Sequence, residues 1–407
     1  MTAPLSPSPD PTDDLPTVRL MPKANARAIR HGFPWVYANE LVTDRHTRKL
    51  PAGSIVRLED SARQPLGVVA LTPDSKIIAR MLDRDPEAVI NQEWFEGHLA
   101  RAHSLRAQLY DAPFYRLIHA EADGLPGVII DRFGDTCVVQ PNAAWSDVLI
   151  DPLCAALQAV TGVPNVLKSA SGRARALEGL DDQNMVLAGV APDAPLQVPM
   201  NGAIYLADLM GGQKTGLFYD QRPNHAFAAQ FARGARVLDV FSHVGGFSLA
   251  ALAGGATQAL AVDGSAPALA LANGGAEAMG MADRFEARQG DAFDVLAALQ
   301  KEEAQFDLVI CDPPAFAPSR NAADAGLRAY ERVARLAAPL VAENGMLALC
   351  SCSHAVDMPQ FRGACVRGIG RAGRQATLLH SGAAGPDHPQ LPQLAESGYL
   401  KSLFFRI

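Results

Sequence analysis

The sequence predicts an α/β protein whose C-terminal half folds into a doubly wound, mostly parallel sheet. From about residue 201 onward, short apolar strands alternate with helical patterns, as in 237–241, 247–253 and 258–262. This alternation is typical of βαβ units. The first 90 residues instead contain short β-rich runs separated by turn residues, which indicates a small β-barrel. The part between them mixes strands and helices, so we expect a central α+β domain.

The expected elements follow in chain order. Apolar alternation predicts strands at 54–58, 66–71, 77–81, 127–131, 136–141, 307–311 and 346–350, and helical spacing predicts helices at 93–109, 147–160, 266–279 and 327–341. Pro192, Pro195 and Pro199 mark an expected linker. We therefore divide the chain into a disordered tail (1–16), a barrel (17–90), a central domain (91–196) and the last domain (197–407).

Composition and charge narrow the class of protein. The 407 residues are 48% apolar and 19% charged, which is typical of a globular protein. The net charge of −7 argues at first against a nucleic-acid partner, but residues 17–108 carry 14 basic against 10 acidic side chains. Six scattered cysteines, no signal peptide and no apolar run of spanning length predict a cytoplasmic protein with reduced thiols and no membrane contact.

Acidic residues follow four successive strands of the last domain. They are Asp239, Asp263, Asp291 and Asp312. Ligands of an open parallel sheet bind beyond the carboxyl ends of its strands, so these side chains are expected to meet at one site. After the first strand, Gly245 and Gly246 let the backbone approach a ligand closely, although such a pair also serves in plain tight turns.

Each acid has a chemical role and a structural alternative. Asp263 is placed to accept hydrogen bonds from ribose hydroxyls, or else it or Ser265 caps the next helix. Asp291 is expected to hold an adenine amino group, with Phe293 packed near the ring. Asp312 begins an Asp-Pro-Pro turn that two prolines stiffen, and a merely rigid turn is the alternative.

The four acids together predict an adenosine-containing cofactor. The first loop lacks G-x-G-x-x-G, and the chain lacks G-x-x-x-x-G-K-[ST], so NAD and ATP lose support. S-adenosyl-L-methionine fits better because it has no phosphates to bind. We expect no metal, since the Cys-x-Cys pair at 350 and 352 lacks further paired ligands.

Cys352 follows the fifth strand, at the edge of the sheet where Asp312 is expected. C5 of a pyrimidine is too weak a nucleophile to take a methyl group unaided. A thiolate that adds to C6 makes C5 enamine-like, and the adduct then collapses by elimination. The alternative is a buried structural cysteine. Cys311 and Cys350 lie within apolar strands and are expected in the core, and His354 is expected at the surface.

The chain resembles the RlmI-type 23S ribosomal RNA cytosine-5 methyltransferases, which are S-adenosylmethionine enzymes with an N-terminal PUA domain. The resemblance covers 18–407 and is least clear in 374–396. The matching stretches are 18–37, 116–134, 214–222 (Lys-Thr-Gly-Leu-Phe-Tyr-Asp-Gln-Arg), 237–247, 312–316 (Asp-Pro-Pro-Ala-Phe) and 351–353 (Ser-Cys-Ser). It implies a PUA β-barrel, a central α+β domain and a Rossmann-like class I methyltransferase domain.

The resemblance also implies roles for single residues. Cys352 would attack C6, and Asp312 would bind the cytosine edge. The expected cofactor-binding residues are Gln221, Asp239, Phe241, Gly245, Gly246, Asp263, Ser265, Asp291, Ala292, Phe293 and Asp312. The expected RNA contacts are Lys214, Arg222, Pro313 and Phe316, with a surface salt bridge as the alternative for the two basic residues.

One departure from the family pattern, and a motif shared with guanine methyltransferases, leave the reaction open. Ala315 stands where many relatives hold a second cysteine, so the base that removes H5 is not assigned. Relatives with Asp-Pro-Pro-x-Phe that methylate guanine lack the strand-five cysteine, which makes Cys352 the discriminating residue. Two further classes of protein also stay open, namely a non-catalytic RNA-binding or ribosome-assembly protein and a small-molecule methyltransferase.

The expected partner is 23S ribosomal RNA, and a homodimer is left open. PUA barrels bind structured RNA mainly through backbone and shape contacts, which suits the basic first domain. A second basic stripe could form from Arg362, Arg367, Arg371 and Arg374, or these could lie on a solvated helix face.

Overall fold

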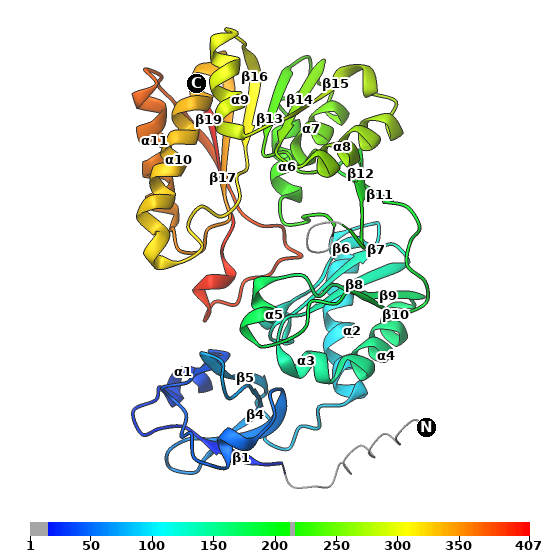
Figure 1. The fold of residues 1–407 in the computed structure, drawn as a ribbon, viewed down its shortest axis with the longest axis vertical. Coiled ribbons are helices and arrows are strands. Elements are labelled where there is room, and N and C mark those ends of the chain that lie inside the picture. The colour runs from blue at the N-terminus through cyan, green and yellow to red at the C-terminus, as the bar shows by residue number, and fades with distance from the viewer. Residues whose placement is uncertain (1–14, 212–215) are drawn as a thin grey trace.

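The computed structural model describes residues 15–211 and 216–407 and places three units along the long axis of the molecule (Figure 1). Two expectations fall wholly or largely outside the described residues: the disordered tail, of which residues 1–14 are not described, and the RNA contact at Lys214.

The first unit is a five-stranded sheet in the order β1-β3-β4-β5-β2. Its elements are β1 (Thr17–Arg19), α1 (Ala26–Arg30), β2 (Trp35–Tyr37), β3 (Ser54–Glu59), β4 (Pro65–Leu71) and β5 (Ile77–Asp83). Alternate residues of β3 and β4, such as Val56 and Val69, fill its core. Glu178 of the central unit accepts hydrogen bonds from Thr72 and Arg80, both at 2.9 Å, so the two units are joined by polar contacts.

The central unit is a five-stranded sheet in the order β10-β9-β8-β7-β6. Its elements are α2 (Gln92–Leu109), β6 (Phe114–His119), β7 (Val128–Phe133), β8 (Thr136–Pro141), α3 (Ala144–Val148), α4 (Ile150–Thr161), β9 (Asn165–Lys168), α5 (Arg173–Leu177) and β10 (Met185–Ala188). The single helix predicted at 147–160 is in fact two. The chain breaks at Leu149, ahead of Pro152, whose ring has no N–H and fits only the first turn of a new helix.

The third unit contains a seven-stranded sheet in the order β15-β14-β13-β16-β17-β19-β18. Its elements are α6 (Arg222–Ala229), β13 (Arg236–Val240), α7 (Gly246–Ala253), β14 (Gln258–Asp263), α8 (Ala266–Ala278), β15 (Phe285–Gln289), α9 (Ala292–Lys301), β16 (Phe306–Cys311), α10 (Ala323–Ala337), β17 (Val341–Ser351), α11 (Met358–Arg371), β18 (Thr377–Gly382) and β19 (Lys401–Arg406). Only β19 runs antiparallel to its neighbours.

Both faces of this sheet are buried, as a parallel sheet between two layers of helices requires. Val237 and Ile310 belong to the core that includes residues of α6, α7 and α8, whereas Leu238 and Val309 belong to the core that includes residues of α9, α10 and α11. The doubly wound prediction is therefore confirmed. All parallel strands end at the same edge, where the site is expected.

The predicted boundaries of one helix in this unit are wrong. The helix expected at 327–341 begins earlier and ends at Ala337, because Pro339 follows and Val341 already starts β17. The last of the three prolines that mark the expected linker, Pro199, lies in β11 (Leu196–Met200), which forms a hairpin with β12 (Ala203–Ala207). A proline fits there because this two-stranded ribbon has open edges.

The segment between β18 and β19 links the third unit to the central one. In Figure 1 it descends from the seven-stranded sheet toward the central unit. The buried Asp387 at its middle accepts a hydrogen bond from the Arg116 N–H at 3.0 Å, and its carbonyl accepts one from the Arg106 guanidinium at 2.9 Å. This segment therefore attaches the third unit to the central unit through buried hydrogen bonds.

Candidate active site at the strand ends

The loop after β13 has an unusual backbone. Phe241, His243 and Gly245 have positive φ angles of 63°, 49° and 81°. Non-glycine residues seldom adopt this conformation, and such outliers gather at ligand sites because the surrounding structure must hold them. The loop is held against the next strand by the Ser242 N–H, which donates to the Val262 carbonyl at 3.0 Å.

Asp263 joins this loop to the one after β14. Its Oδ2 accepts from the His243 N–H at 2.9 Å, and its Oδ1 accepts from the Ser265 N–H at 2.8 Å. Each carboxylate oxygen has a second lone pair, which leaves capacity for ribose hydroxyls. Ser265 itself caps α8, since its Oγ accepts from the Ala268 N–H at 3.3 Å. The helix cap expected as the structural role of Ser265 is therefore what the structure shows.

Asp239 holds the end of this loop at the start of α7 by a buried hydrogen bond. Its side chain is fully buried, and its Oδ2 accepts from the Ser248 N–H at 2.9 Å, at the start of α7. Burial raises the pKa of this carboxyl to about 6. Gly246 is needed in the first turn of α7, since a Cβ there would come within 2.7 Å of the His225 ring.

The loop after β15 brings a carboxylate and an aromatic ring. Asp291 is exposed and caps α9, with its Oδ1 accepting from the Phe293 and Asp294 N–H groups at 2.9 and 3.2 Å, while Ala292 is buried. The ring centroid of Phe293 lies 6.5 Å from that of Phe241 and 6.2 Å from that of Phe316. Three aromatic rings from three strand ends therefore form one cluster.

Asp312 follows β16 and is held by a residue that lies far away in the sequence. The Gln221 Nε2 donates to its Oδ2 at 2.9 Å, and Gln221 is oriented in turn by Asn224, whose Nδ2 donates to Oε1 at 2.7 Å. Burial, and next the charge of Asp220, raise the pKa of Asp312 to about 8, against the effect of the Gln221 bond. Gln221 is thus buried beside Asp312 as an orienting group.

Cys352 lies in a turn that is fastened to the Asp-Pro-Pro loop. Its neighbours Ser351 and Ser353 are fully buried, and the Tyr330 hydroxyl bonds both, at 2.9 and 2.7 Å. The Ser353 Oγ also accepts from the Ala317 N–H at 3.0 Å. Cys352 is the partly exposed cysteine and the other five are buried, so its thiol is the accessible one at the sheet edge.

Sequence reasoning missed two residues near Cys352, namely Tyr399 and Lys401. The Tyr399 hydroxyl donates to the Asp220 carboxylate at 2.6 Å. The Lys401 Nζ donates to the carbonyls of Ser353, at 2.9 Å, and of Tyr399, at 2.7 Å. The one feature of the sequence that could have indicated Lys401 is its position at the start of the mostly apolar run 401–406.

The expected RNA contacts are only partly at the site. Arg222 does not face the strand ends: its guanidinium lies 4.1 Å from the Tyr110 ring centroid and donates to the Phe114 carbonyl, so it joins α6 to the central unit. Pro313 is buried, and Phe316 is half-buried with its ring 5.0 Å from that of Tyr330. Arg374 likewise does not extend the basic stripe expected on the 362–374 segment, since its guanidinium donates to the Val341 carbonyl at 2.9 Å.

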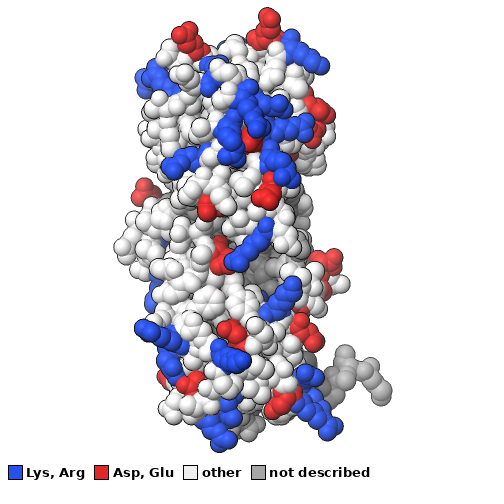
Figure 2. Space-filling view, turned by 90° about the vertical axis from the view of Figure 1, so that its left-hand side faces the viewer, with Lys and Arg blue, Asp and Glu red and all other residues white. Residues whose placement is uncertain are grey.

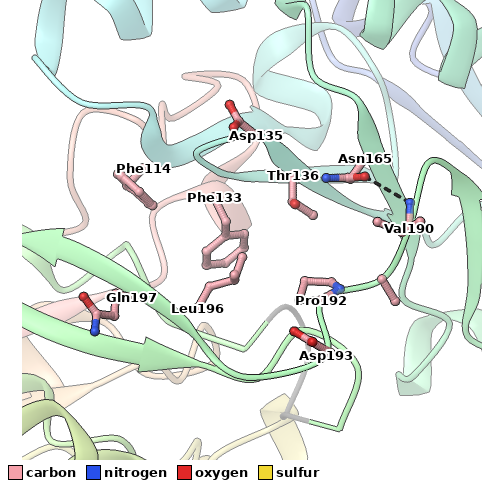
Figure 3. A pocket seen from close by; sticks show the side chains of 11 residues that line it. Phe114, Phe133, Asp135, Thr136, Asn165, Val190, Pro192, Asp193, Leu196 and Gln197 are labelled. Carbon is pink, nitrogen blue, oxygen red and sulfur yellow. Dashed lines mark hydrogen bonds between the residues drawn. The ribbon is translucent and has the colours of Figure 1, made fainter. Parts of the chain in front are cut away.

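A cavity of about 550 Å³ lies elsewhere, between the central sheet and the segment leading into β11. Figure 3 shows Phe114, Phe133 and Leu196 on one side of it, and the Asn165 side chain bonded to the Val190 N–H at 3.0 Å on another. None of the lining residues comes from the strand-end loops, so this cavity is separate from the site.

The donors and acceptors at the ends of β13 and β14 fit S-adenosylmethionine. Asp239 Oδ1 and Ser242 Oγ are buried and have no hydrogen-bond partner within the described ranges. Together with Asp263 they provide acceptors for hydroxyl and amino groups, and the Phe241 and Phe293 rings provide an apolar surface for adenine. With the strand order, this set defines a Rossmann-like methyltransferase.

Comparison with known proteins gives the family. A profile of S-adenosylmethionine-dependent methyltransferases matches residues 154–406, and a profile of PUA-like domains matches residues 18–84. The chain therefore belongs to the S-adenosylmethionine-dependent methyltransferase family and carries an N-terminal PUA-like domain. The predicted fold class and the predicted cofactor are confirmed.

Individual relatives align along almost the whole chain. The chain is 33% identical to Ribosomal RNA large subunit methyltransferase I of Photobacterium profundum over 384 residues, covering 93% of this chain and 96% of the relative. It is 32% identical to the protein of the same name from Serratia proteamaculans over 397 residues, covering 96% and 100%.

Solved structures share the fold. A protein described as a SAM-dependent methyltransferase from Streptococcus mutans aligns with a TM-score of 0.81 at 22% identity, covering 97% of this chain and 100% of that one. A methyltransferase complexed with SAH aligns with a TM-score of 0.80 at 22% identity, covering 96% and 99%. Within the described residues, none of the helices is both long and apolar enough to cross a membrane.

Proposed function

We propose that this protein transfers a methyl group from S-adenosylmethionine to C5 of a cytosine in 23S ribosomal RNA, with Cys352 as the nucleophile. The observation that carries the proposal is the fastening of the Cys352 turn to the Asp312 loop through Tyr330 and Ser353. A thiol and a carboxyl fixed on adjacent strands β16 and β17 can act on two positions of the same flipped-out base.

Asp312 favours cytosine over guanine. The cytosine edge offers an acceptor at N3 and a donor at N4, which a neutral carboxyl matches with one O–H and one C=O. The guanine edge offers donors at N1 and N2 and is matched by an ionised carboxylate. Because the pKa of Asp312 is raised to about 8, the neutral form dominates at pH 7.

In the proposed reaction, the residues of this chain take part in the addition to C6 and in the elimination that follows methyl transfer. The Cys352 thiolate forms a bond to C6 while Asp312 gives its proton to N3, and C5 becomes nucleophilic. Bound S-adenosylmethionine would supply an electrophilic methyl group on its sulfonium. C5 forms a bond to this methyl group while the methyl–sulfur bond breaks and the neutral thioether leaves. When H5 is lost to a base, the C5=C6 bond re-forms, the thiolate leaves C6, and Asp312 recovers the proton from N3.

The proposed RNA partner is supported by charge on one side of the methyltransferase unit. Helices α10 and α11 carry six exposed arginines, namely Arg328, Arg332, Arg335, Arg362, Arg367 and Arg371. Figure 2 shows Lys and Arg side chains gathered on the side where these helices lie. Arg367 and Arg371 share one partner, Glu331, so the face keeps a basic surplus. Such a surface attracts the phosphates of RNA, and the names of the relatives agree with this partner.

The second candidate is methylation of guanine, which the Asp-Pro-Pro-Ala-Phe motif alone would allow. The proposal is tested by incubating the protein with S-adenosylmethionine and 23S RNA from a strain that lacks the enzyme, followed by nuclease digestion and mass spectrometry. We expect 5-methylcytidine. Methylguanosine would replace the proposal by the second candidate, and failure to bind S-adenosylmethionine in calorimetry would indicate a non-catalytic RNA-binding protein.

A further inference from the structure

Lys401 is a buried cation beside the proposed nucleophile. It is 6% exposed, at the first position of β19, where it pairs with Ser351 of β17. Two of its three N–H bonds go to the carbonyls of Ser353 and Tyr399. The first of these carbonyls belongs to the residue directly after Cys352, so the ammonium lies at the turn that carries the thiol.

This ammonium is not explained as half of a structural ion pair. The comparably buried Lys168 has Asp147 at 2.8 Å and Asp181 at 3.7 Å from its Nζ. Among the described residues, no carboxylate lies within 4.0 Å of the Lys401 Nζ. A buried charge needs compensation, and carbonyl dipoles supply only part of it.

We propose that the Lys401 ammonium is the counter-cation of the Cys352 thiolate and so acts as a positioning residue for the nucleophile. The proposal rests on the proposed function of Cys352. Burial lowers the pKa of Lys401, and the negative charge of Cys352 acts in the opposite direction, as expected for two groups that stabilise each other's charged forms.

Other groups also face the thiol. Two hydroxyls lie close enough to Cys352 to be affected by its charge, that of Tyr330 from α10 and that of Tyr399 from the segment before β19. Burial is the main cause that raises the pKa of each hydroxyl, and the charge of Cys352 raises it further. Both therefore stay neutral near pH 7 and supply no charge. Asp357, at the start of α11, and Asp220, bonded to Tyr399, are acidic and would raise the pKa of a thiol. Arg116 of the central unit also acts on Tyr399, but its guanidinium is paired with Asp131 at 2.6 Å. Lys401 is therefore the cation we assign to the thiolate.

The test measures the pH dependence of Cys352 alkylation by iodoacetamide, in which a C–S bond forms and iodide leaves. It needs neither RNA nor cofactor, and mass spectrometry of the Cys352 peptide excludes the five buried cysteines. In the wild type we expect a thiol pKa below the usual value of about 8.5. Lys401→Met should slow alkylation at pH 7 about tenfold or more, with rates that converge at high pH.

Lys401→Arg, which keeps the positive charge, is the matched control and should retain most of the reactivity at pH 7. Thermal unfolding and calorimetry with S-adenosylmethionine show whether each variant is folded. A wild-type thiol that titrates at about 8.5 or above overturns the proposal, and this holds even if Lys401→Met does not fold. An unchanged titration in Lys401→Met also overturns it. A methylguanosine product would instead remove the proposed function and leave the measured thiol pKa standing.

Discussion

The two halves of the strand-end site are held together in different ways. In the cofactor half, formed by the loops after β13, β14 and β15, the Asp239 bond to Ser248 spans 9 residues and the Asp263 bond to His243 spans 20. In the base half, formed by the loops after β16 and β17, Gln221 reaches Asp312 across 91 residues. Lys401 reaches Ser353 across 48 residues.

This difference separates what local sequence can specify from what tertiary packing must supply. The cofactor half is built by successive βα turns, in which each carboxylate is held by the backbone of its own turn or, for Asp263, also by that of the neighbouring turn. The base half forms only when α6, α10 and the last two strands, β18 and β19, are packed in their native positions. The side-chain hydrogen bonds described for each half stay within that half, whereas the two halves meet through the Phe316 ring, which lies 6.2 Å from Phe241, and through the Asp312 N–H, which donates to the Val240 carbonyl at 3.1 Å. A substitution in one half that leaves these two contacts in place should therefore leave the other half's function nearly intact.

The largest expected effect comes from removing the nucleophile. Cys352→Ala should lower the methylation rate by on the order of 10³-fold or more, because no other group can add to C6. The affinity for S-adenosylmethionine should stay within about twofold, since the cofactor half is intact. Single-turnover methylation and calorimetry measure the two quantities. A variant that still forms 5-methylcytidine would refute the thiolate mechanism.

An effect of intermediate size is expected in the cofactor half. Asp263→Ala removes the carboxylate that joins the first two loops, so the Kd for S-adenosylmethionine should rise about 10- to 100-fold, or ~1.5–3 kcal/mol. Alkylation of Cys352 without cofactor should not change. Asp294→Ala, at an exposed carboxylate in the first turn of α9, is the control and should leave the Kd unchanged. Equal losses in both variants would contradict the assigned role of Asp263.

The same division explains how much could be predicted from the sequence. Apolar alternation and strand-end acids predicted the sheet, its helices and the positions of Asp263 and Asp291, because these depend on neighbouring residues. The helix end before Pro339 and the break at Leu149 were missed because helical spacing continues past both in the sequence. Lys401 and Tyr399 were missed for a deeper reason: only the antiparallel pairing of β19 with β17 brings them to Cys352. The stacking of Arg222 on Tyr110 was not predicted because a ring that lies far away in the sequence cannot be inferred from one basic residue.

The smallest expected effect is a change in pH dependence within the base half. The rate of methyl transfer should rise as the Cys352 thiol ionises and fall as Asp312, with its pKa of about 8, loses the proton that N3 needs. The Gln221 Nε2 donates to the ionised carboxylate and so lowers this pKa. Gln221→Leu should therefore move the falling limb upward by about one pH unit, which is a gain of a few-fold at high pH.

Ser402→Ala is the control for this substitution. Its hydroxyl also bonds Gln221, at 3.5 Å to Oε1, but makes no bond to Asp312, so the falling limb should stay in place. The measurement is single-turnover methylation from pH 6 to 10 at saturating cofactor. If the falling limb is the same in Gln221→Leu and wild type, Asp312 is not the proton donor. The two halves of the site would then differ only in the sequence separation of the contacts that hold them. A shift in the predicted direction would show that a contact across 91 residues sets the protonation of the base-binding carboxyl.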